Sequence, residues 1–382
     1  MSRCIVIFAT MVASPGAIVF SIFLLLALVQ VFYYLFFFSR LAYHKPTAAD
    51  HSQQHPVSVI ICARDEEENL GRNLPAVLDQ EYPSTHEVIV INDNSVDDSK
   101  YSLAEMQKAH RQLQVVDLEQ EAKGIAGKKF PLSIGIKESK HELILLTDAD
   151  CKPASPQWIY TMQAAFGEGI EVALGYGAYE KAPGFLNKVI RFETFHTALQ
   201  YFSYALAGVP YMGVGRNLAY RKAVFFRNKG FSSINHIPSG DDDLFINKVA
   251  NKRNTAVVLD PGSFTFSAPK QTWKEWKRQK NRHYSTGKYY KTAHKFLLGL
   301  YTGSFFLFYP FFILSMVFFD WRLALVPFVL RLLVQAIIWQ KAMKRLGEHD
   351  LFPLFFLWDI WMLFYYILFA PALWKKPKKT WN

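Results

Sequence analysis

The chain of 382 residues is poor in cysteine and lacks two common glycine-rich nucleotide-binding patterns. Its three cysteines, Cys4, Cys62 and Cys151, form no spaced pair, so neither a disulfide framework nor a zinc site is indicated. No G-x-G-x-x-G pattern follows the first expected strand, and G-x-x-x-x-G-K-[ST] is absent from the sequence. Neither a Rossmann-type dinucleotide site nor a P-loop is therefore supported.

Apolar residues, in contrast, exceed what a soluble domain needs: 51% of the chain is hydrophobic and 16% aromatic. Residues 17 to 38 are almost wholly apolar, with Gln30 the only strongly polar side chain, and this length spans a bilayer as a helix. No small-residue cleavage site follows, which favours an anchor over a removed signal peptide. Arg40, His44 and Lys45 come next, so we expect the following domain on the cytoplasmic side of the cell (inner) membrane.

Two further strong spans are predicted near the C-terminus, at residues 296 to 319 and 351 to 374, with a weaker one at 323 to 340. Arg331 lies in the middle of the weaker segment, and Asp359 interrupts the last one. Charges inside spans usually pair or line a site, so we expect these two to pair, either as a contact between helices or beside a lipid substrate. The sequence thus predicts a multi-pass membrane protein.

Charges around these spans leave the topology open. In a four-span arrangement, three basic residues after the weaker span fall on the cytoplasmic side, namely Lys341, Lys344 and Arg345. The same arrangement puts the tail outside, against the positive-inside tendency, with Lys375, Lys376, Lys378 and Lys379. Either the tail escapes this tendency, or one apolar segment lies in the membrane interface or re-enters.

Part of the net charge of +11 is concentrated in one segment, where Lys270 to Lys295 contains nine Lys or Arg and one acid, Glu275. The segment adjoins an apolar span and carries aromatic residues typical of the lipid headgroup level: Trp273, Trp276, Tyr284 and Tyr289. We therefore expect contact with the membrane surface and no nucleic-acid partner. The chain divides into an N-terminal anchor (1–45), a cytoplasmic domain (46–269), this basic aromatic segment (270–295) and C-terminal membrane helices with a basic tail (296–382).

The cytoplasmic part alternates strands with helices. Apolar runs predict strands at residues 57–63, 87–91, 114–118 and 142–147, separated by helical stretches. This alternation is typical of an α/β domain with a mainly parallel, Rossmann-like sheet, which binds ligands at the carboxyl ends of its strands. Polar clusters follow three of the strands at that edge: Arg64 to Glu66, Asp93 to Asp98 and Asp148 to Asp150.

The last of these clusters has the chemistry of a metal site. Leu143 to Leu146 form an apolar strand, and Asp148 and Asp150 follow it at a spacing of two, so both side chains point to the same side of an extended chain. Two hard oxygen ligands suit Mg²⁺ or Mn²⁺, which complete their shells with water and substrate phosphates. A diphosphate-bearing substrate is the natural partner. The alternative is a turn in which the aspartates only cap the next helix.

The second half of the domain adds two candidate features. Residues 213 to 220 predict a glycine-punctuated loop that enters a helix, and Asp241, Asp242 and Asp243 precede a helix that runs to about residue 252. One interpretation is that the three acids are stabilised by the positive end of the helix dipole. The other is that one of them is a general base, because adjacent like charges raise the pKa of one carboxyl. Lys128 opens an earlier helix, where it could meet a diphosphate.

Taken together, these motifs resemble the inverting family 2 glycosyltransferases with a GT-A fold, especially the membrane-anchored members, over residues 55 to 290. The resemblance implies that Asp93 contacts the nucleotide base, that Asp148 and Asp150 hold the metal and the sugar-nucleotide, and that Lys128 lies near the nucleotide. It also identifies Arg64 and Glu66 with the family's "R-[ND]-E" turn at the donor site.

Two elements of the resemblance bear on the acceptor. Gly240-Asp241-Asp242 is similar to the "[TG]-[ED]-D" element, whose last acid is the catalytic base; this favours Asp242, although spacing to the next helix also allows Asp241. Gln279 and Arg282 match the Q-x-x-R-W motif that binds diphosphate or acceptor, but His283 replaces the tryptophan that holds an acceptor sugar in polymerising members. Processive synthesis is therefore less expected than a single transfer.

The resemblance implies a metal-dependent transfer from a nucleotide-sugar to a hydroxyl or phosphate of a membrane-associated acceptor, such as a lipid, a polyprenyl-linked saccharide or a terpenoid. Three alternatives stay open from the sequence. They are a processive polysaccharide synthase, a metal-dependent nucleotidyltransferase or phosphohydrolase, and a non-catalytic nucleotide-binding membrane scaffold.

Overall fold

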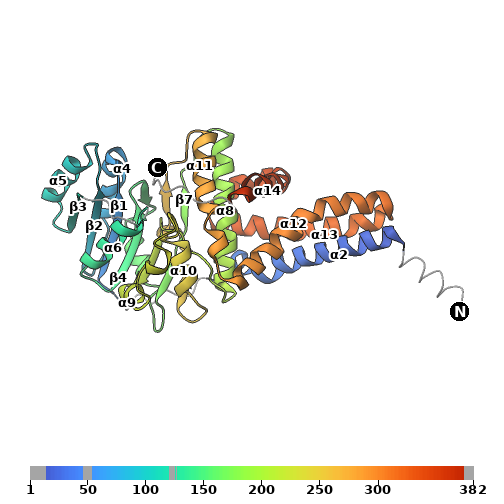
Figure 1. Cartoon of the computed structure of the whole chain (residues 1–382), viewed down its shortest axis with the longest axis horizontal. Coiled ribbons are helices and arrows are strands. Elements are labelled where there is room, and N and C mark those ends of the chain that lie inside the picture. The colour runs from blue at the N-terminus through green and yellow to red at the C-terminus, as the bar shows by residue number, and fades with distance from the viewer. Residues whose placement is uncertain (1–13, 46–53, 120–124, 126, 374–382) are drawn as a thin grey trace, which may run out of the picture.

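The computed structural model describes residues 14–45, 54–119, 125 and 127–373. Figure 1 shows a domain built on a twisted sheet at one end and three long helices at the other. Two helices lie side by side between them, α8 (Phe185–Leu206) and α11 (Trp273–Tyr284). The basic aromatic segment, which contains α11, is therefore wedged between the domain and the long helices.

A seven-stranded sheet with the strand order β3-β2-β1-β4-β8-β6-β9 forms the centre of the domain. Its first four strands are parallel, as predicted: β1 Val57–Ala63, β2 His86–Asp93, β3 Leu113–Leu118 and β4 Leu143–Asp148. Alternate residues of β1 enter two separate cores, because side chains of a strand alternate between the faces of a sheet. Val59 belongs to one core and Ile60 to the other.

Helices cover both faces of these strands, and their bounds are α4 Glu67–Leu78, α5 Ser99–Ala109, α6 Lys129–Glu138 and α7 Trp158–Gln163. Helix α6 approaches the sheet closely at Gly135, where an added Cβ would lie 2.6 Å from Cγ2 of Ile60. Burial of β1 on both faces explains its uninterrupted apolar sequence.

The second half of the sheet departs from the prediction at residues 213–220. This loop enters a strand, β8 (Leu218–Arg221), that pairs antiparallel with both β4 and β6 (Val172–Leu174). The expected helix begins only at α9 (Lys222–Arg227). Leu218 packs into one core and Ala219 into the other, a contact with distant strands that four residues of local sequence do not reveal.

Short strands complete the domain beside the end of β4. A three-stranded sheet pairs β10 (Thr265–Ser267) with β5 (Cys151–Pro153) and β7 (Gly177–Tyr179), while β9 (Thr255–Val257) closes the large sheet. Helix α10 (Asp243–Val249) begins at the last residue of the acidic cluster, with Asp242 as its N-cap. In the chain, β5 of this small sheet directly follows Asp150, and β7 is the last strand before α8.

Within the described residues, four helical segments are long and apolar enough to cross a membrane: Pro15–Ala42, Thr292–Phe318, Trp321–Arg345 and His349–Leu373. The first consists of α2 (Pro15–Phe32), a π-helical turn (Tyr33–Phe38) and α3 (Ser39–Ala42); the second and third are α12 and α13. Helices α2, α12 and α13 pack side by side as a bundle (Figure 1). Phe23, Ala27 and Phe308 fill its interior.

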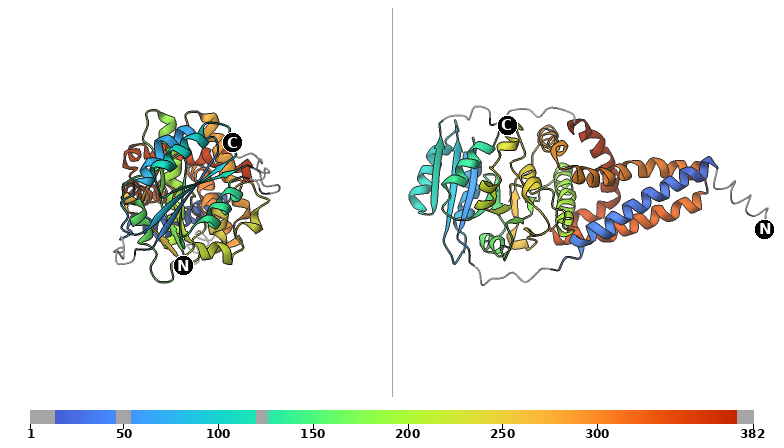
Figure 2. Two further views of the ribbon diagram at one scale, coloured as in Figure 1. Left: turned by 90° about the vertical axis from the view of Figure 1, so that its left-hand side faces the viewer. Right: turned by 60° about the horizontal axis from the view of Figure 1, so that its bottom comes forward.

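The fourth segment is arranged differently. Its α-helical part, α14 (Phe355–Phe369), lies across the base of the bundle near α8 and α11 (Figure 2). Its fifteen residues extend about 22 Å, and 3-10 turns at both ends, His349–Leu354 and Ala370–Leu373, complete the 25-residue segment. One face of α14 packs on protein, with Trp358 stacked on Phe192 at 4.7 Å. The opposite face is apolar and exposed, at Phe356, Ile360, Phe364 and Ile367.

Helix α8 joins the domain to these helices through one continuous apolar core. Phe202 of α8 contacts Tyr176 on the sheet side, at a ring distance of 6.4 Å. Phe192 contacts Trp339 of α13 at 5.3 Å, and Tyr204 contacts Phe37 of the N-terminal helix at 4.7 Å. The core therefore has no break between the domain and the membrane helices.

The predicted pair between Arg331 and Asp359 is confirmed as a contact between helices. A guanidinium N–H of Arg331 donates to Asp359 at 2.6 Å, and both side chains are buried. Gln335 donates to the other carboxylate oxygen at 2.7 Å, and the Tyr309 hydroxyl also donates to Asp359. The carboxylate thus links α12, α13 and α14.

Removing one member of this pair should destabilise the protein more than removing both. We expect Arg331→Leu to lower the free energy of unfolding by about 3–5 kcal/mol, because it leaves the Asp359 charge buried without its cation. The double variant Arg331→Leu/Asp359→Leu should recover much of that loss. Arg322→Leu, at the exposed start of α13, is the matched control. Thermal unfolding in detergent measures the effect, and equal losses in the single and double variants would contradict the prediction.

Candidate active site

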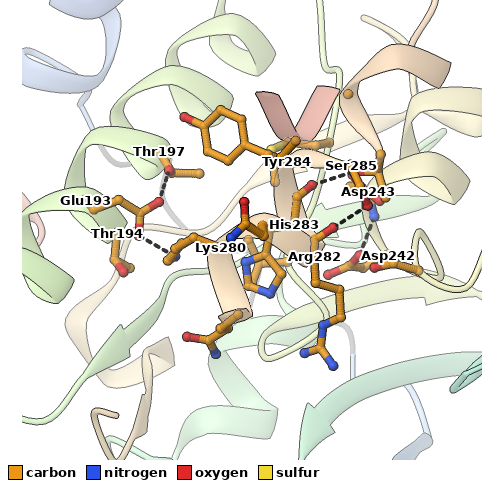
Figure 3. Close-up of a pocket in the computed structure, with 18 of the residues that line it drawn as sticks. Glu193, Thr194, Thr197, Asp242, Asp243, Lys280, Arg282, His283, Tyr284 and Ser285 are labelled. Carbon is orange, nitrogen blue, oxygen red and sulfur yellow. Dashed lines mark hydrogen bonds and ion pairs between the residues drawn. The ribbon is translucent and has the colours of Figure 1, made fainter. Parts of the chain in front are cut away.

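A cavity of about 2130 Å³ lies between the carboxyl edge of the sheet, α8, α11 and α12. Its wall includes Asp148 and Asp150 at one end and residues of the membrane helix α12, such as Gly303, at the other. Figure 3 shows the part of the wall where α8, α10 and α11 meet. One continuous space therefore connects the metal-type carboxylates with the membrane bundle.

Asp148 and Asp150 lie together at the sheet edge, as their spacing predicted. Both are half-buried, and Lys128, just before α6, forms an ion pair with Asp148. Burial acts to raise the pKa of Asp148, but the Lys128 ammonium lowers it overall. Burial and the nearby Asp148 carboxylate raise the pKa of Asp150. Among the described residues, no lysine forms an ion pair with Asp150 as Lys128 does with Asp148.

The donor set fits the expected cation. Asp148, Asp150 and Cys151 offer atoms that all lie within 4.8 Å of one another. Burial raises the pKa of the Cys151 thiol, which donates to Oδ1 of Asp150 at 3.4 Å. Mg²⁺ and Mn²⁺ prefer hard oxygen ligands, so the two carboxylates are the residues that would hold either ion and the protonated thiol is not.

Arg216 is a cation beside these carboxylates that sequence reasoning missed. Its guanidinium lies over the Tyr179 ring at 4.3 Å and donates to the carbonyl of Ala178 at 3.2 Å. Its charge acts to lower the pKa of both Asp148 and Asp150. The signal in the sequence is slight, a single arginine after two glycines in a loop. A guanidinium in this position suits bidentate contact with phosphate.

Helix α11 brings the three residues of the Q-x-x-R-H motif to the cavity. Gln279 donates to the Tyr179 hydroxyl at 3.2 Å, and the Arg282 side chain extends into the open space (Figure 3). His283 also lines the cavity, where desolvation and the charges of Lys280 and Arg282 hold its pKa well below the usual value. His283 is therefore neutral at pH 7.

Lys280 lies between these residues but turns inward, unlike a lysine at a membrane surface. Its ammonium forms an ion pair with Glu193 of α8, and both side chains are buried. Tyr365 of α14 donates to the same carboxylate at 3.0 Å. Lys280 therefore does not contribute to the membrane surface expected of segment 270–295, because it ties α11 to α8 and α14.

Gly240 precedes the acidic cluster, and its backbone conformation requires glycine. Gly240 has φ +97°, and an added Cβ would lie 2.4 Å from Cδ1 of Leu244. This conformation is strained for other residues. It turns the chain so that Asp242, but not Asp241, lines the cavity. Geometry thus separates the two candidate bases.

Asp242 and Asp243 have different surroundings. Asp242 accepts the N–H groups of Gly215 at 2.8 Å and Asp243 at 2.7 Å. Burial, followed by the neighbouring Asp241 and Asp243 charges, nevertheless raises the pKa of Asp242 to about 7. Asp243 accepts hydroxyl groups of Thr286 at 2.5 Å and Tyr290 at 2.7 Å. Asp243 therefore anchors the segment that follows α11, while both Asp242 and Asp243 line the cavity.

A family model described as "Glycosyltransferase like family 2" matches residues 55–286. The match covers the sheet, the carboxylates at its edge, the acidic cluster and α11. The chain belongs to glycosyltransferase family 2. This is the family that the motifs resembled.

Curated family 2 relatives match parts of the chain. A poly-β-1,6-N-acetyl-D-glucosamine synthase of Staphylococcus epidermidis is 34% identical over 122 residues, 31% of this chain and 27% of the relative. YdaM of Bacillus subtilis, described as a probable glycosyltransferase, is 27% identical over 236 residues, 59% of this chain and 54% of the relative. A β-monoglucosyldiacylglycerol synthase of Nostoc is 31% identical over 107 residues, 28% of this chain and 22% of the relative. The chain thus spans about a quarter to a half of these relatives.

The solved structure of the mannosyltransferase PcManGT from Pyrobaculum calidifontis, in complex with GDP-Man and Mn²⁺, has the same fold. The TM-score is 0.59 at 15% sequence identity, and the match covers 91% of this chain and 99% of that one. This confirms the predicted GT-A fold, a mainly parallel sheet with helices on both faces.

Most residues expected at the donor site line the cavity: Arg64, Glu66, Lys128, Asp148, Asp150, Gln279 and Arg282. Burial raises the pKa of Glu66, which accepts a hydrogen bond from Asn69 at 2.5 Å. Asp93 differs, because it is buried at the end of β2, accepts from the Asn94 side chain at 2.9 Å and lies outside the cavity wall. The individual roles of these residues stay predictions.

The raised pKa of Asp242 gives a pH prediction. A base must be unprotonated to accept a proton, so we expect kcat/KM for transfer to rise as the pH increases through about 7 and to level off above it. Below that pH the neutral carboxyl is inactive. A pH-rate profile of the purified enzyme measures this, and a rate that falls as the pH rises through the same range would contradict it.

A matched pair of variants tests the same assignment. Asp242→Asn should lower turnover by about 100-fold or more, the usual contribution of a positioned base. Asp241→Asn, one residue away and outside the cavity wall, should retain most activity. The opposite pattern would show that Asp241 is the base.

Proposed function

We propose that this protein is a membrane-bound, inverting glycosyltransferase that moves one sugar from a nucleotide-sugar to a membrane-associated acceptor with the help of Mg²⁺ or Mn²⁺. The observation that carries the proposal is the continuity of the cavity. It joins a carboxylate pair suited to a metal diphosphate, a carboxylate with a pKa of about 7, and a helix of the membrane bundle.

The donor is bound at the Asp148 and Asp150 end. Arg216 and Arg282 line the same space and supply cations for the diphosphate. A divalent metal, when bound by the carboxylates, neutralises charge on the departing diphosphate. The Pyrobaculum mannosyltransferase of the same fold was solved with GDP-Man and Mn²⁺, which makes Mn²⁺ the first ion to test.

The transfer step uses one carboxylate of this chain. Asp242 accepts the proton of the acceptor hydroxyl as that oxygen attacks the anomeric carbon, and the bond from that carbon to the diphosphate breaks. Attack from the face opposite the leaving group inverts the configuration. A second, protonating acid is unnecessary, because a nucleoside diphosphate leaves as an anion, unlike the leaving group of a glycoside hydrolase.

A single addition is favoured over processive synthesis. Within the described parts of α2 and α12, the buried side chains of Phe23, Ala27 and Phe308 pack together inside the bundle, which supports a single addition. By the resemblance of residues 279–283 to the Q-x-x-R-W motif, His283 occupies the position of the tryptophan that holds an acceptor sugar. The relatives include both a polysaccharide synthase and a glycolipid synthase, so the acceptor class rests on the cavity and the bundle.

We further infer a topology with three spans, α2, α12 and α13, and with α14 at the cytoplasmic membrane interface. Helices α12 and α13, with 27 and 25 residues, extend about 40 and 37 Å. The segment His349–Leu373 is equally long, but α14 packs one face on α8 and α11 and lies across the base of the bundle. This departs from the expectation that residues 351–374 form a strong span. It also places the lysines of residues 375–379, which lie outside the described residues, on the same side as Lys341 and Lys344.

The position of the C-terminus tests this topology. We expect a fluorescent protein fused after residue 382 to fold and fluoresce in the cytoplasm, whereas alkaline phosphatase at the same position stays inactive. A fusion after Asp320, between α12 and α13, should give the opposite result and serves as the control. Active alkaline phosphatase at the C-terminus would instead support four spans.

Donor turnover tests the proposed function. Purified, detergent-solubilised protein with Mn²⁺ is screened against a panel of radiolabelled nucleotide-sugars and a total membrane-lipid extract. We expect release of a nucleoside diphosphate and label in the lipid fraction, both lost in Asp150→Ala because the metal loses its main ligand. Chelation by EDTA should have the same effect as the variant.

Other outcomes identify the alternatives. Label in a large water-soluble polymer would indicate a processive synthase. Cleavage of the donor between its phosphates would indicate a nucleotidyltransferase or phosphohydrolase. Metal-dependent binding of a nucleoside diphosphate without turnover of any donor would indicate a non-catalytic scaffold.

A further inference from the structure

The membrane end of the cavity is formed by one face of α12. Lys295, Gly299, Gly303 and Phe306 follow one another at spacings of three or four and all line the cavity. Residues at these spacings share a helix face. From Lys295 to Phe306 this face extends about 16 Å, roughly half of a hydrocarbon core of about 30 Å. The cavity therefore reaches about one leaflet deep.

The two glycines mark open space on this face. An added Cβ at Gly299 or at Gly303 would have no atom within 4 Å, unlike Gly135 in the domain. The facing wall comes from the end of α14 and the following turn, where Ile367 and Ala370 line the same cavity. We call this space the α12–α14 groove, with Gly299 and Gly303 on one side and Ile367 and Ala370 on the other.

Charge and polarity change along the groove. Lys288 and Lys295 line it at the end nearest the domain, and apolar or small residues line it further into the membrane bundle. Lys288 and Lys295 line the cavity on the side of α12. Arg216 lines it on the side of the domain, where its charge acts to lower the pKa of Asp150. A cationic entrance above an apolar channel complements a molecule with an anionic head and an apolar chain.

We propose that the α12–α14 groove binds the acceptor, a membrane lipid with a phosphate-bearing headgroup. Its apolar chain lies over Gly299 and Gly303, and its phosphate lies near Lys288 and Lys295. The headgroup then extends into the same cavity that Asp242 lines, so the attacking oxygen reaches the base without the chain leaving the bilayer. The inference rests on the proposed function and specifies the acceptor class and its entry route.

Because the groove reaches about one leaflet deep, it suits a lipid better than a polymer or a soluble sugar. A polymer that crosses the membrane needs a passage through both leaflets, and the groove ends near Phe306 in the cavity wall. A soluble sugar acceptor needs no apolar channel beside exposed Ile367. A lipid chain of one leaflet has the matching length and polarity.

Graded bulk at Gly303 tests the groove. Gly303→Ala should leave transfer to lipid nearly unchanged, whereas Gly303→Leu and Gly303→Trp should lower it by about tenfold or more by filling the space. Donor hydrolysis without lipid and binding of the nucleoside diphosphate should stay within about twofold of wild type, because donor residues are untouched. Val317→Trp, on the exposed lipid face of the same helix, is the matched control.

The charge of the entrance is tested separately. Lys295→Gln should raise the KM for the lipid acceptor by about threefold to tenfold without changing the KM for the donor. Lys344→Gln, an exposed lysine at the same membrane surface on α13, should have no such effect. Radiolabelled product should elute with anionic lipids on anion exchange. Transfer into neutral lipids with unchanged kinetics in Lys295→Gln would overturn the phosphate part of the proposal.

A readout independent of turnover uses phosphatidic acid with a diazirine in its acyl chain, in phosphatidylcholine nanodiscs. After irradiation, crosslinks should map to residues 366–373, and Gly303→Trp should remove them while Val317→Trp keeps them. Normal lipid transfer by Gly303→Trp, or crosslinks that persist in it, would overturn the groove alone. Absence of donor turnover in the wild type would instead overturn the proposed function itself.

Discussion

The rest of the structure depends on one continuous apolar core, which runs from the sheet through α8 to the membrane helices. Phe202 contacts the sheet side and Phe192 contacts Trp339 and Trp358 of the membrane part. A buried ion-pair cluster reinforces the same joint, where Arg191 of α8 binds Glu348 at 2.5 Å and Asp350 at 2.6 Å. Because packed interiors resist deformation, the domain keeps a fixed position relative to the bundle. The cavity can therefore have one end at the sheet and the other in the membrane without a mobile linker between them.

The packing of the domain against the helix bundle also determines where the charged side chains lie in the cavity. The carboxylates of Asp148 and Asp150 belong to the sheet edge, Asp242 belongs to the start of α10, and Arg282 comes from α11. The Lys280–Glu193 pair and the contacts of Asp243 with Thr286 and Tyr290 hold α11 and the following segment against α8 and α10. Burying a paired charge costs little compared with burying a lone one, so these pairs fix positions that apolar packing alone leaves loose. Burial and the neighbouring charges of Asp241 and Asp243 raise the pKa of Asp242, although two backbone N–H groups donate to it.

The membrane part gives α14 a different role from the other apolar helices. Its 15 α-helical residues extend about 22 Å, and its inner face packs on α8 and α11 through Trp358 and Phe369. It lies where the cavity meets the bundle, so it forms a wall of that space. The inferred position of α14 at the membrane interface agrees with the positive-inside tendency of the basic tail.

Local sequence was sufficient to predict the parallel half of the sheet, the proximity of Asp148 and Asp150, and the apolar helices, because the spacing of apolar residues indicates which side chains are buried. It also predicted the Arg331–Asp359 pair, because charges inside apolar segments usually pair. It did not determine β8, Arg216, the inward turn of Lys280 or the orientation of α14. Each of these depends on partners far apart in the chain: Leu218 on β4 and β6, Arg216 on Tyr179, Lys280 on Glu193, and Trp358 on Phe192. The motif already favoured Asp242 over Asp241, and the tertiary structure adds that Asp242 lines the cavity whereas Asp241 does not.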